Sequence, residues 1–578
     1  MGTRPKPLFW IALLAVVVGL VAYAIHRARV RNEGGSADAG SRAAGSPAPR
    51  ASAPPSGPAL ELAFHTSSAK KAWANEMVER FNAAGHRVNG LLVRVKATHV
   101  ESGASLDQLE AGKARPDVWS PGDESWIRLA NAHWKRTRNK ELFARSDPLV
   151  NIPLVVAMWE PMARALGYPK PIGWLDIAKL AANPQGWAAY GHPEWGRFRW
   201  GHAHPDANSG FLAVISEVYA ALGKTSGISP DDLRNPAVRA ALQQFEGAVE
   251  HYGLSNSWID DMMHSRGPAY LSCAVQYENT IAESNEKHQN QPFKLVAVYP
   301  REGNFWTQHP AAIPDEEWMT PDRRAAARAF VDFLLSREAQ EAALRRGLRP
   351  ILADIEIGAP LDEAHGILAK PPMARQFQVP DEAVLKRIRD LWEDAKVPAT
   401  VILVLDRSSS MKGPAMDGAR AGAIEFVRQM RPRDRVEAVV FSSDIATLSG
   451  PCSIRECGEQ TIDRLSGVFA EGQTSLYDVI ALSFERLRKM QEAEPRRRYA
   501  AVVLSDGQDT SSKQNRHDFL DRLPRGEEVD VPKIFTIAYG SQADTALLSE
   551  VSNRTNARIF SSTAEEIGRT YKELSANF

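Results

Sequence analysis

One run of strand-forming residues constrains the C-terminal part of the 578-residue chain more than any other feature. Residues 399–405 read ATVILVL, a continuous apolar run that is typical of a parallel strand covered on both faces. The strand is followed by a loop in which Asp406, Ser408 and Ser410 occupy alternate positions. Side chains at alternate loop positions point the same way, so this loop offers three hard oxygens to a hard cation.

Two later loops complete this set of oxygens. The segment 472–476 supplies the hydroxyl of Thr474, and a second apolar strand at 501–504 ends in Ser505-Asp506-Gly507. The order Asp-x-Ser-x-Ser, then Thr, then Asp resembles the von Willebrand factor A (VWA) domain and its metal-ion-dependent adhesion site. The resemblance covers residues 398–578 and implies an α/β fold with a doubly wound, Rossmann-like sheet. It also implies that Mg²⁺ or Mn²⁺ is bound by Asp406, Ser408, Ser410, Thr474 and Asp506.

The match to this family has one departure and one alternative. Ser409 stands where the family usually has a glycine, but this position is not a ligand, so we expect the metal site to persist. The alternative is that the hydroxyls only cap helices. A metal held by so few negative charges keeps an open coordination position. A carboxylate of a partner protein can fill that position, which predicts protein binding rather than catalysis.

The N-terminal half alternates strands with helices, which predicts an α/β sheet whose ligand lies beyond the carboxyl ends of the strands. Serines occur at three junctions between strands and helices: Ser67 and Ser68 after a strand at 60–65, Ser120 after 116–119, and Ser209 before a helix at 211–222. Serines at helix starts suit an anion or a small polar ligand that is held by N–H groups and hydroxyls without a cation. Each serine is also compatible with a plain helix cap.

Several segments of this half resemble type II periplasmic solute-binding proteins. They are 151–159, similar to the crossover strand; 186–187 with 193–196; 204–205 with 208–210; 298–303, similar to the return strand; and 330–347, similar to the closing helix, followed by 349–350. The resemblance covers residues 60–350 and implies a two-lobed fold with a ligand between the lobes. Carried over by position, the cleft candidates are Ser67, Ser68, Ser120, Ser209, Tyr277 and Tyr299.

The ligand of the cleft stays open at this point. The family implies an oxyanion such as molybdate or sulfate, ferric iron, or a small organic solute. A ferric site would need anionic oxygens besides the two tyrosines, and Glu278 is a candidate. His202 and His204 offer a transition-metal pair, although a structural role is the stronger interpretation. Since 12 of the 14 tryptophans lie between Trp73 and Trp318, an aromatic cleft that stacks on a sugar or organic ring is a further alternative.

The N-terminus predicts a membrane anchor. Residues 8–25 form an unbroken apolar run of 18 residues, which is just long enough to span a bilayer as an α-helix. A short segment, 1–7, precedes it. A linker at 26–59 follows, in which 22 of the 25 residues from Gly34 to Pro58 are Gly, Ala, Ser or Pro, a composition that predicts disorder. A cleaved secretory signal is the alternative, because Ala22-Tyr23-Ala24 offers a small-x-small cleavage site.

We expect a single-pass cell-membrane protein whose folded modules are extracytoplasmic. The count of flanking cations slightly favours the opposite orientation, with two before the run and three after it.

In an oxidising compartment, Cys452 and Cys457, which lie in a predicted loop, can form a small disulfide. Residues 351–397 form a connector, and apolar side chains at helical spacing from Val384 to Trp392 predict a helix that packs on one of the modules.

Composition excludes one class of partner. The 70 basic and 70 acidic residues cancel, so the chain lacks the surplus of cations that nucleic-acid binding requires. No Gly-x-Ser-x-Gly motif or other catalytic set is visible, so we expect no enzyme, with a hydrolase as the weaker alternative. The predicted function is a membrane-anchored binding protein with a solute-binding module and a metal-dependent, protein-binding VWA module. The alternative is the substrate-binding component of an ABC-type importer for an oxyanion or a small organic solute.

Overall fold

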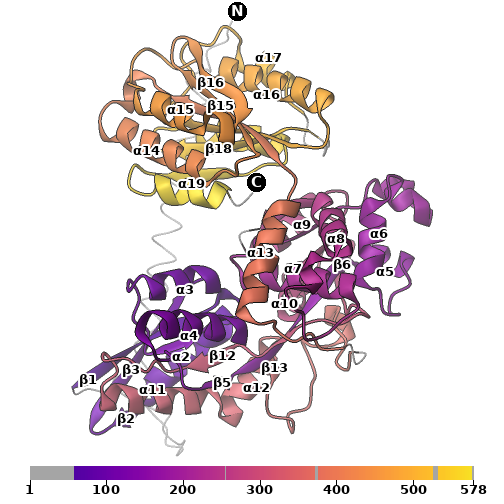
Figure 1. Ribbon diagram of the computed structural model, residues 1–578, viewed down its shortest axis with the longest axis vertical. Coiled ribbons are helices and arrows are strands. Elements are labelled where there is room, and N and C mark those ends of the chain that lie inside the picture. The colour runs from indigo at the N-terminus through magenta and orange to yellow at the C-terminus, as the bar shows by residue number, and fades with distance from the viewer. Residues whose placement is uncertain (1–57, 254, 372–374, 525–530, 576–578) are drawn as a thin grey trace, which may run out of the picture. The chain divides into compact units, whose positions relative to one another are not determined.

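The computed structural model describes residues 58–253, 255–371, 375–524 and 531–575 (Figure 1). The predicted membrane span at 8–25 and most of the predicted linker lie outside the described residues. Within the described ranges, no helix combines the length and the apolar character that crossing a bilayer requires. These ranges contain a two-lobed module, which reaches from β1 to α13, and a second α/β module, which begins at β14.

The first lobe is built on a six-stranded sheet in the order β2-β3-β1-β4-β12-β5. Its strands are β1 (Ala59–Thr66), β2 (Arg87–Val88), β3 (Leu91–His99), β4 (Val118–Ser120), β5 (Ser146–Pro148) and β12 (Pro310–Ala312). Its helices are α2 (Lys71–Ala84), α3 (Ser102–Glu110), α4 (Glu124–Arg138), α11 (Pro321–Leu334) and α12 (Arg337–Arg345). Strand β1 pairs in parallel with β3 and β4, so the carboxyl ends of these strands meet at one edge.

The second lobe contains a sheet in the order β10-β6-β9-β7-β8, with β11 and β13 paired to β6. Its strands are β6 (Val150–Trp159), β7 (Trp200–Ala203), β8 (Val249–Gly253), β9 (Cys273–Tyr277), β10 (Leu295–Val298), β11 (Trp306–Thr307) and β13 (Arg349–Pro350). Its helices are α5 (Glu160–Ala165), α6 (Trp174–Ala182), α7 (Asn208–Leu222), α8 (Pro236–Gly247), α9 (Asn256–Arg266) and α10 (Glu278–Lys287). The chain enters this lobe through β6 and returns to the first sheet at β12.

The predicted connector belongs to the two-lobed module. Helix α13 (Glu382–Ala395) buries Val384, Ile388 and Trp392 in the same apolar cluster as both lobes, and it packs on α7 and α8. The closing helix expected at 330–347 is two helices, α11 and α12. The reason is local: the hydroxyl of Ser336 accepts a hydrogen bond from the Ala339 N–H (3.4 Å) and starts a new helix.

The module from β14 onward has one sheet in the order β16-β15-β14-β17-β18-β19, parallel except for β16. Its strands are β14 (Ala399–Asp406), β15 (Arg435–Phe441), β16 (Ile445–Ser453), β17 (Arg498–Ser505), β18 (Lys533–Tyr539) and β19 (Ile559–Ser562). Its helices are α14 (Pro414–Gln429), α15 (Ile454–Ser466), α16 (Leu476–Ala493), α17 (Arg516–Asp521), α18 (Thr545–Arg554) and α19 (Ile567–Ser575).

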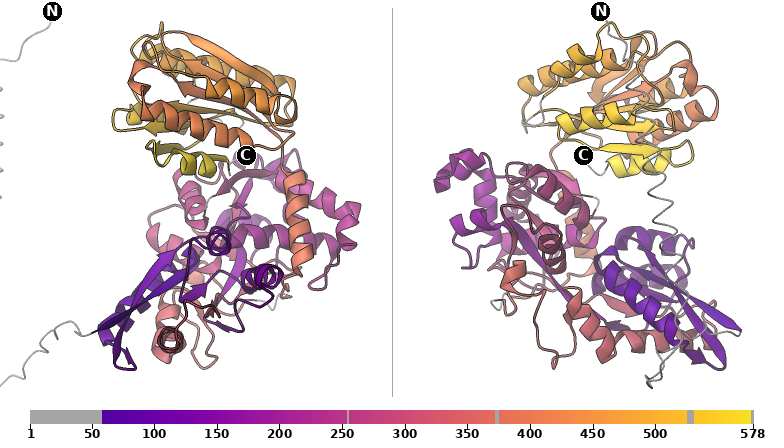
Figure 2. Two further views of the ribbon diagram at one scale, coloured as in Figure 1. Left: turned by 60° about the vertical axis from the view of Figure 1, so that its left-hand side comes forward. Right: turned by 180° about the vertical axis from the view of Figure 1, so that it is seen from behind.

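Two separate apolar clusters cover the two faces of this sheet. Val401, Leu403 and Leu405 of β14 join the cluster with α14, α15 and α19. Ile402 and Val404 point the other way and join the cluster with α16, α17 and α18. Figure 1 and Figure 2 show these helices on both sides of the sheet. The continuous apolar run of β14 is therefore explained by burial on both faces, as expected for a doubly wound sheet.

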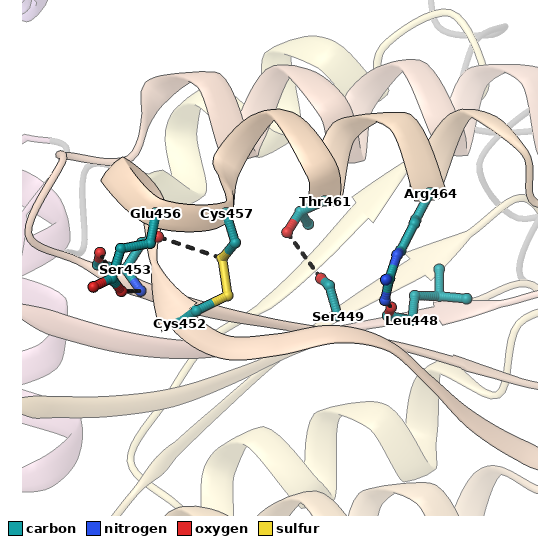
Figure 3. The surroundings of a disulfide bond; sticks show 8 residues. All are labelled: Leu448, Ser449, Cys452, Ser453, Glu456, Cys457, Thr461 and Arg464. Atoms are coloured by element: carbon teal, nitrogen blue, oxygen red, sulfur yellow. Dashed lines mark hydrogen bonds between the residues drawn. A yellow bond between two sulfur atoms is a disulfide. The ribbon is translucent and has the colours of Figure 1, made fainter.

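Cys452 and Cys457 are joined in a disulfide with a Cα–Cα distance of 6.1 Å (Figure 3). The expectation that they lie in a loop is wrong, because Cys452 belongs to β16 and Cys457 to α15. Ser453 and Glu456 form a capping box that starts the helix directly after the strand, and the Ser453 hydroxyl donates to the Glu456 carboxylate (2.8 Å).

Candidate functional site

The two-lobed module contains a small polar cavity that is lined by residues of both lobes. Its volume is about 60 Å³, which is room for a few water-sized groups. Four of the predicted residues line it: Ser67, Ser68, Ser209 and Tyr277. Sequence reasoning missed the acidic and amide side chains beside them: Glu101, Asn208, Asn256, Asn279 and Glu283. The cavity therefore presents hydroxyls, amides and carboxyls to a ligand.

A buried lysine lies directly behind this lining. The Lys70 ammonium donates to the hydroxyl of Ser67 (3.0 Å) and to the carbonyl of Ser120 (3.0 Å), and its Nζ lies 3.3 Å from Nδ1 of His309. Lys70 has no carboxylate partner among the described residues, and burial holds its pKa well below the usual value. Lys70 does not itself line the cavity, so the expectation of a ligand held without a cation stays a prediction. A lysine at the start of a helix is normally exposed to solvent. Lys70 is buried because residues distant in sequence, among them His309, pack against it, and the local sequence does not indicate this.

The predicted serines do not act as simple helix caps. Ser67 makes no side-chain capping bond, because its hydroxyl accepts from Lys70. Ser120 is buried but does not line the cavity, and its hydroxyl has no hydrogen-bond partner among the described residues. The Ser209 hydroxyl donates to Asn256 Oδ1 (2.8 Å), which joins α7 to the start of α9.

Tyr277 and Tyr299 occupy different environments. Asn208 Nδ2 donates to the Tyr277 hydroxyl at the cavity (2.6 Å), and burial raises the pKa of Tyr277. Tyr299 does not line the cavity. Its hydroxyl donates to Glu278, which also forms a two-bond ion pair with Arg349 (2.7 and 2.8 Å). Glu278 is thus committed to a buried ion pair, so it does not supply a ligand for the iron site considered above.

Tryptophans do not line the cavity. Eight of them are among the largest fully buried side chains: Trp73, Trp119, Trp134, Trp159, Trp174, Trp187, Trp200 and Trp392. Their concentration in this half of the chain reflects core packing rather than an aromatic ligand cleft.

His202 and His204 have different hydrogen-bond partners. The His202 ring bonds to a backbone carbonyl, while His204 Nδ1 accepts from the Asp206 N–H (3.2 Å).

The second candidate site lies at the carboxyl edge of the β14–β17 sheet. Asp406 is fully buried at the end of β14, where Oδ1 accepts from the Ser408 N–H (2.8 Å) and Oδ2 from the Ser505 hydroxyl (2.6 Å). The hydroxyls of Ser408 and Ser410 lie 3.0 Å apart, and Ser410 donates to Asp506 Oδ1 (2.8 Å). Four predicted ligands therefore form one hydrogen-bonded chain.

Thr474 lies beside this chain. A Cβ built on Gly507 would be 4.0 Å from both the Ser410 Oγ and the Thr474 Oγ1, so the two hydroxyls flank one point next to Asp506. The backbone N–H of Thr474 donates to the Thr510 hydroxyl (2.9 Å), which fixes the loop before α16. The structure therefore brings all five predicted oxygens to one end of the sheet.

The charge at this edge is not balanced by a neighbouring cation. Burial raises the pKa of Asp406 to about 6 and also raises the pKa of Asp506. Arg407, the nearest cation in sequence, forms its ion pairs with Asp444 and Glu471 instead. Two carboxylates and three hydroxyls without a cationic partner among the described residues are hard oxygens of the kind that Mg²⁺ and Mn²⁺ prefer, so the donor set fits such an ion.

Comparison with known families agrees with this division of the chain. Residues 62–349 match the family described as "Bacterial extracellular solute-binding protein", and residues 401–508 match the "von Willebrand factor type A domain". The chain thus combines a solute-binding module with a VWA domain.

Among curated proteins, the inter-alpha-trypsin inhibitor heavy chain H1 of Bos taurus is 25% identical over 173 residues, 28% of this chain and 18% of that protein. Heavy chain H4 of Bos taurus is 28% identical over 125 residues, 21% of this chain and 14% of that protein. The chain thus spans less than a fifth of the length of these relatives.

Several solved structures are similar to parts of this chain. A periplasmic thiamin binding protein is 16% identical, with a TM-score of 0.41 over 58% of this chain and 95% of that chain. The sulfate-binding protein SubI from Mycobacterium tuberculosis is 17% identical, with a TM-score of 0.35 over 54% and 93%. A von Willebrand factor type A protein from Catenulispora acidiphila is 12% identical, with a TM-score of 0.28 over 31% and 42%. Scores this low do not identify a ligand.

Proposed function

We propose that this fusion of a solute-binding module and a VWA domain is a membrane-anchored, extracytoplasmic binding protein. In this proposal the VWA domain binds a partner protein through a divalent ion, and the two-lobed module binds a small solute. The observation that carries it is the set of oxygens at the carboxyl edge of β14 and β17, where Asp406 and Asp506 face hydroxyls and no paired cation among the described residues.

Asp406, Ser408, Ser410, Thr474 and Asp506 would hold Mg²⁺ or Mn²⁺. When bound, the ion supplies an electrophilic coordination position that a carboxylate of a partner can fill. The protein's own contribution is to fix the oxygens: the Ser408 N–H and the Ser505 hydroxyl hold both oxygens of Asp406 in place. Such preorganisation reduces the ordering cost of binding.

The solute in this proposal is small, polar and anionic. Burial raises the pKa of Glu101 and raises that of Glu283 to about 7, so both carboxyls of the lining can be neutral beside an anion. A cavity of about 60 Å³ accommodates an oxyanion, whereas a larger ligand requires the lobes to open. Because Lys70 donates to the Ser67 oxygen, the Ser67 proton is left to be donated, toward His309 or toward a ligand. An anion at this position also stabilises the charged form of the buried Lys70, which strengthens the binding electrostatically.

Native mass spectrometry of the detergent-solubilised full chain tests both sites together. We expect a co-purified low-mass solute, and a mass increase on addition of Mg²⁺ that Asp406→Ala abolishes. Isothermal titration with sulfate as the probe anion measures the cleft directly. The proposal fails if Asp406→Ala takes up Mg²⁺ as the unsubstituted chain does.

Anchoring and transport are tested separately. The proposed anchor at 8–25 predicts that the chain stays in the membrane fraction after an alkaline wash and that protease added outside the cell digests the modules.

Under the alternative role as the substrate-binding component of an ABC-type importer, uptake of the solute requires a permease and an ATPase, and Asp406→Ala leaves uptake intact. Loss of uptake in that variant would instead show that uptake requires the metal site of the VWA domain.

A further inference from the structure

A second group of potential metal ligands is enclosed in the second lobe, apart from both sites described above. His202 of β7, Glu217 of α7 and Glu246 of α8 are all fully buried, with 0% of each residue exposed. One ligand atom of each lies within 4.8 Å of the other two. The three residues come from separate elements, so the packing of two helices on one strand brings them together.

These side chains carry polar atoms that the surrounding protein leaves unpaired. Both carboxylate oxygens of Glu217, Oε1 of Glu246 and Nε2 of His202 have no hydrogen-bond partner among the described residues. Burial, and then the Glu246 carboxylate, raise the pKa of Glu217 well above its usual value. An unpaired carboxylate costs several kcal/mol in such an interior, so a group that satisfies these atoms would stabilise the lobe.

The histidine is oriented as a ligand. Its Nδ1 lies 2.7 Å from the carbonyl oxygen of Ala203, an acceptor, so Nδ1 carries the proton and Nε2 presents its lone pair to the carboxylates. Histidines that bind metals in proteins are commonly held in this way, with the other ring nitrogen donating to a backbone carbonyl. The Tyr252 hydroxyl donates to Glu246 Oε2 (2.5 Å) and leaves Oε1 facing His202.

The spacing suits a small tetrahedral ion. Ligand atoms about 2.1 Å from such an ion are about 3.4 Å from one another. His202 Nε2 and Glu246 Oε1 lie 3.5 Å apart. One imidazole and two carboxylates match the nitrogen and oxygen preference of Zn²⁺, and the absence of thiolates disfavours softer ions.

The position of α7 gives the site a structural role. A Cβ on Gly210 would lie 2.0 Å from the Ala203 carbonyl oxygen, so only glycine lets α7 approach β7 this closely. Glu217 lies two turns further along the same helix, whose first residues, Asn208 and Ser209, line the solute cavity. An ion on Glu217 would fix the helix that presents those residues.

We propose that His202, Glu217 and Glu246 bind a buried Zn²⁺ ion that ties α7 and α8 to β7 and so rigidifies the second lobe. This inference is independent of the proposed function, because it requires neither a solute nor a metal in the VWA domain.

The test measures the zinc content of the full chain in an Asp406→Ala background, which removes the expected VWA ion. After expression with Zn²⁺ and exhaustive dialysis, we expect about one zinc per chain. Glu217→Gln, which keeps the shape and removes the charge, should lose the zinc. Asp260→Asn is the matched control: it changes a buried carboxyl of the same lobe, in a second group with His264 and His288, and should retain the zinc.

Thermal melting supplies the second measurement. A chelator should lower the melting temperature of the background protein by several degrees and leave that of the Glu217→Gln protein unchanged. X-ray absorption at the zinc edge of the background protein should show nitrogen and oxygen neighbours with an imidazole and no sulfur, a result that does not depend on whether Glu217→Gln folds. A background protein that holds no zinc, or loses it through Asp260→Asn rather than Glu217→Gln, overturns the proposal.

Discussion

Two pairs of acidic side chains in this chain differ in what surrounds them. Asp406 and Asp506 stand at the carboxyl edge of the VWA sheet, where each accepts a hydrogen bond from a serine hydroxyl. Glu217 and Glu246 lie inside the second lobe, where three of their four carboxylate oxygens have no hydrogen-bond partner among the described residues. The protein supplies hydrogen bonds to the first pair, and it leaves most carboxylate oxygens of the second pair without one.

The difference shows how position sets the cost of a charge. Asp406 is buried too, but both of its oxygens accept hydrogen bonds from Ser408 and Ser505, so it can remain ready for a ligand at a lower cost to stability. A carboxylate in a core must be neutralised by a proton, a cation or a metal, because the interior cannot solvate it. We therefore expect the buried pair to matter for folding and the edge pair to matter for binding.

The largest effect is expected from breaking the buried pair. Glu246→Ala should lower the free energy of unfolding by about 3–5 kcal/mol, because it leaves Tyr252 unpaired and opens a cavity around Glu217. Denaturant unfolding of the full chain measures this loss. Gln244→Ala, an exposed change on the same helix, should cost less than about 0.5 kcal/mol. Equal costs for the two variants would show that the buried carboxylate matters no more for folding than an exposed side chain of the same helix.

The edge pair, Asp406 and Asp506, should instead affect the stability of the VWA domain through a bound metal ion. Mg²⁺ at about a hundred times its dissociation constant should stabilise the folded VWA domain by about 2.7 kcal/mol, and Asp406→Ala should abolish this gain. The measurement is the melting temperature with and without Mg²⁺. Asp444→Ala, which removes an exposed carboxylate near the same edge, should keep the gain. If Asp406→Ala responds to Mg²⁺ like the unsubstituted chain, the edge pair is not a metal site.

Removing the disulfide identifies which unfolding step of the full chain belongs to the VWA domain. Replacing both Cys452 and Cys457 by serine should cost about 2 kcal/mol, since the bridge closes a short loop in the unfolded chain. A reducing agent should destabilise the unsubstituted chain by a similar amount and leave the double variant unchanged. The unfolding step that shifts is thereby assigned to the VWA domain, and Glu246→Ala should leave that step in place.

The smallest effect on free energy is expected at Lys70, the buried lysine that donates to Ser67 in the cavity lining. Lys70→Met should weaken the binding of sulfate by about tenfold, the value of one charge-assisted hydrogen bond. Isothermal titration provides the measurement. Lys71→Met, at the neighbouring exposed lysine, should leave the affinity unchanged. Equal affinities for all three proteins would show that Lys70 serves the fold and not the ligand.

The sequence predicted the edge site in detail because its ligands follow strands. Asp406 and Asp506 each come directly after a buried apolar strand, and parallel neighbours in a sheet bring such loops together. Local pattern and tertiary position therefore give the same answer. The boundary of β16 was less accessible, since Gly450 and Pro451 resemble a loop although the strand continues to Ser453.

The cleft was predicted only in part. The serines that line it could be found from strand-to-helix junctions, but Lys70 looks like any exposed residue in the first turn of a helix. Tyr299 matched the family pattern, yet its hydroxyl bonds to Glu278, a contact that depends on Arg349 from a distant strand. Contacts between residues far apart in sequence decided both cases.

The two modules, the doubly wound sheet and the five oxygens at its edge can be predicted from local patterns, because each strand and the loop after it are contiguous in the sequence. Which charged side chains are buried depends on how distant elements pack. Glu217 and Glu246 lie on separate helices, and nothing in either helix indicates that they face each other and His202. Burial is a property of packing, so local sequence patterns indicate neither the burial of Lys70 nor the carboxylate pair.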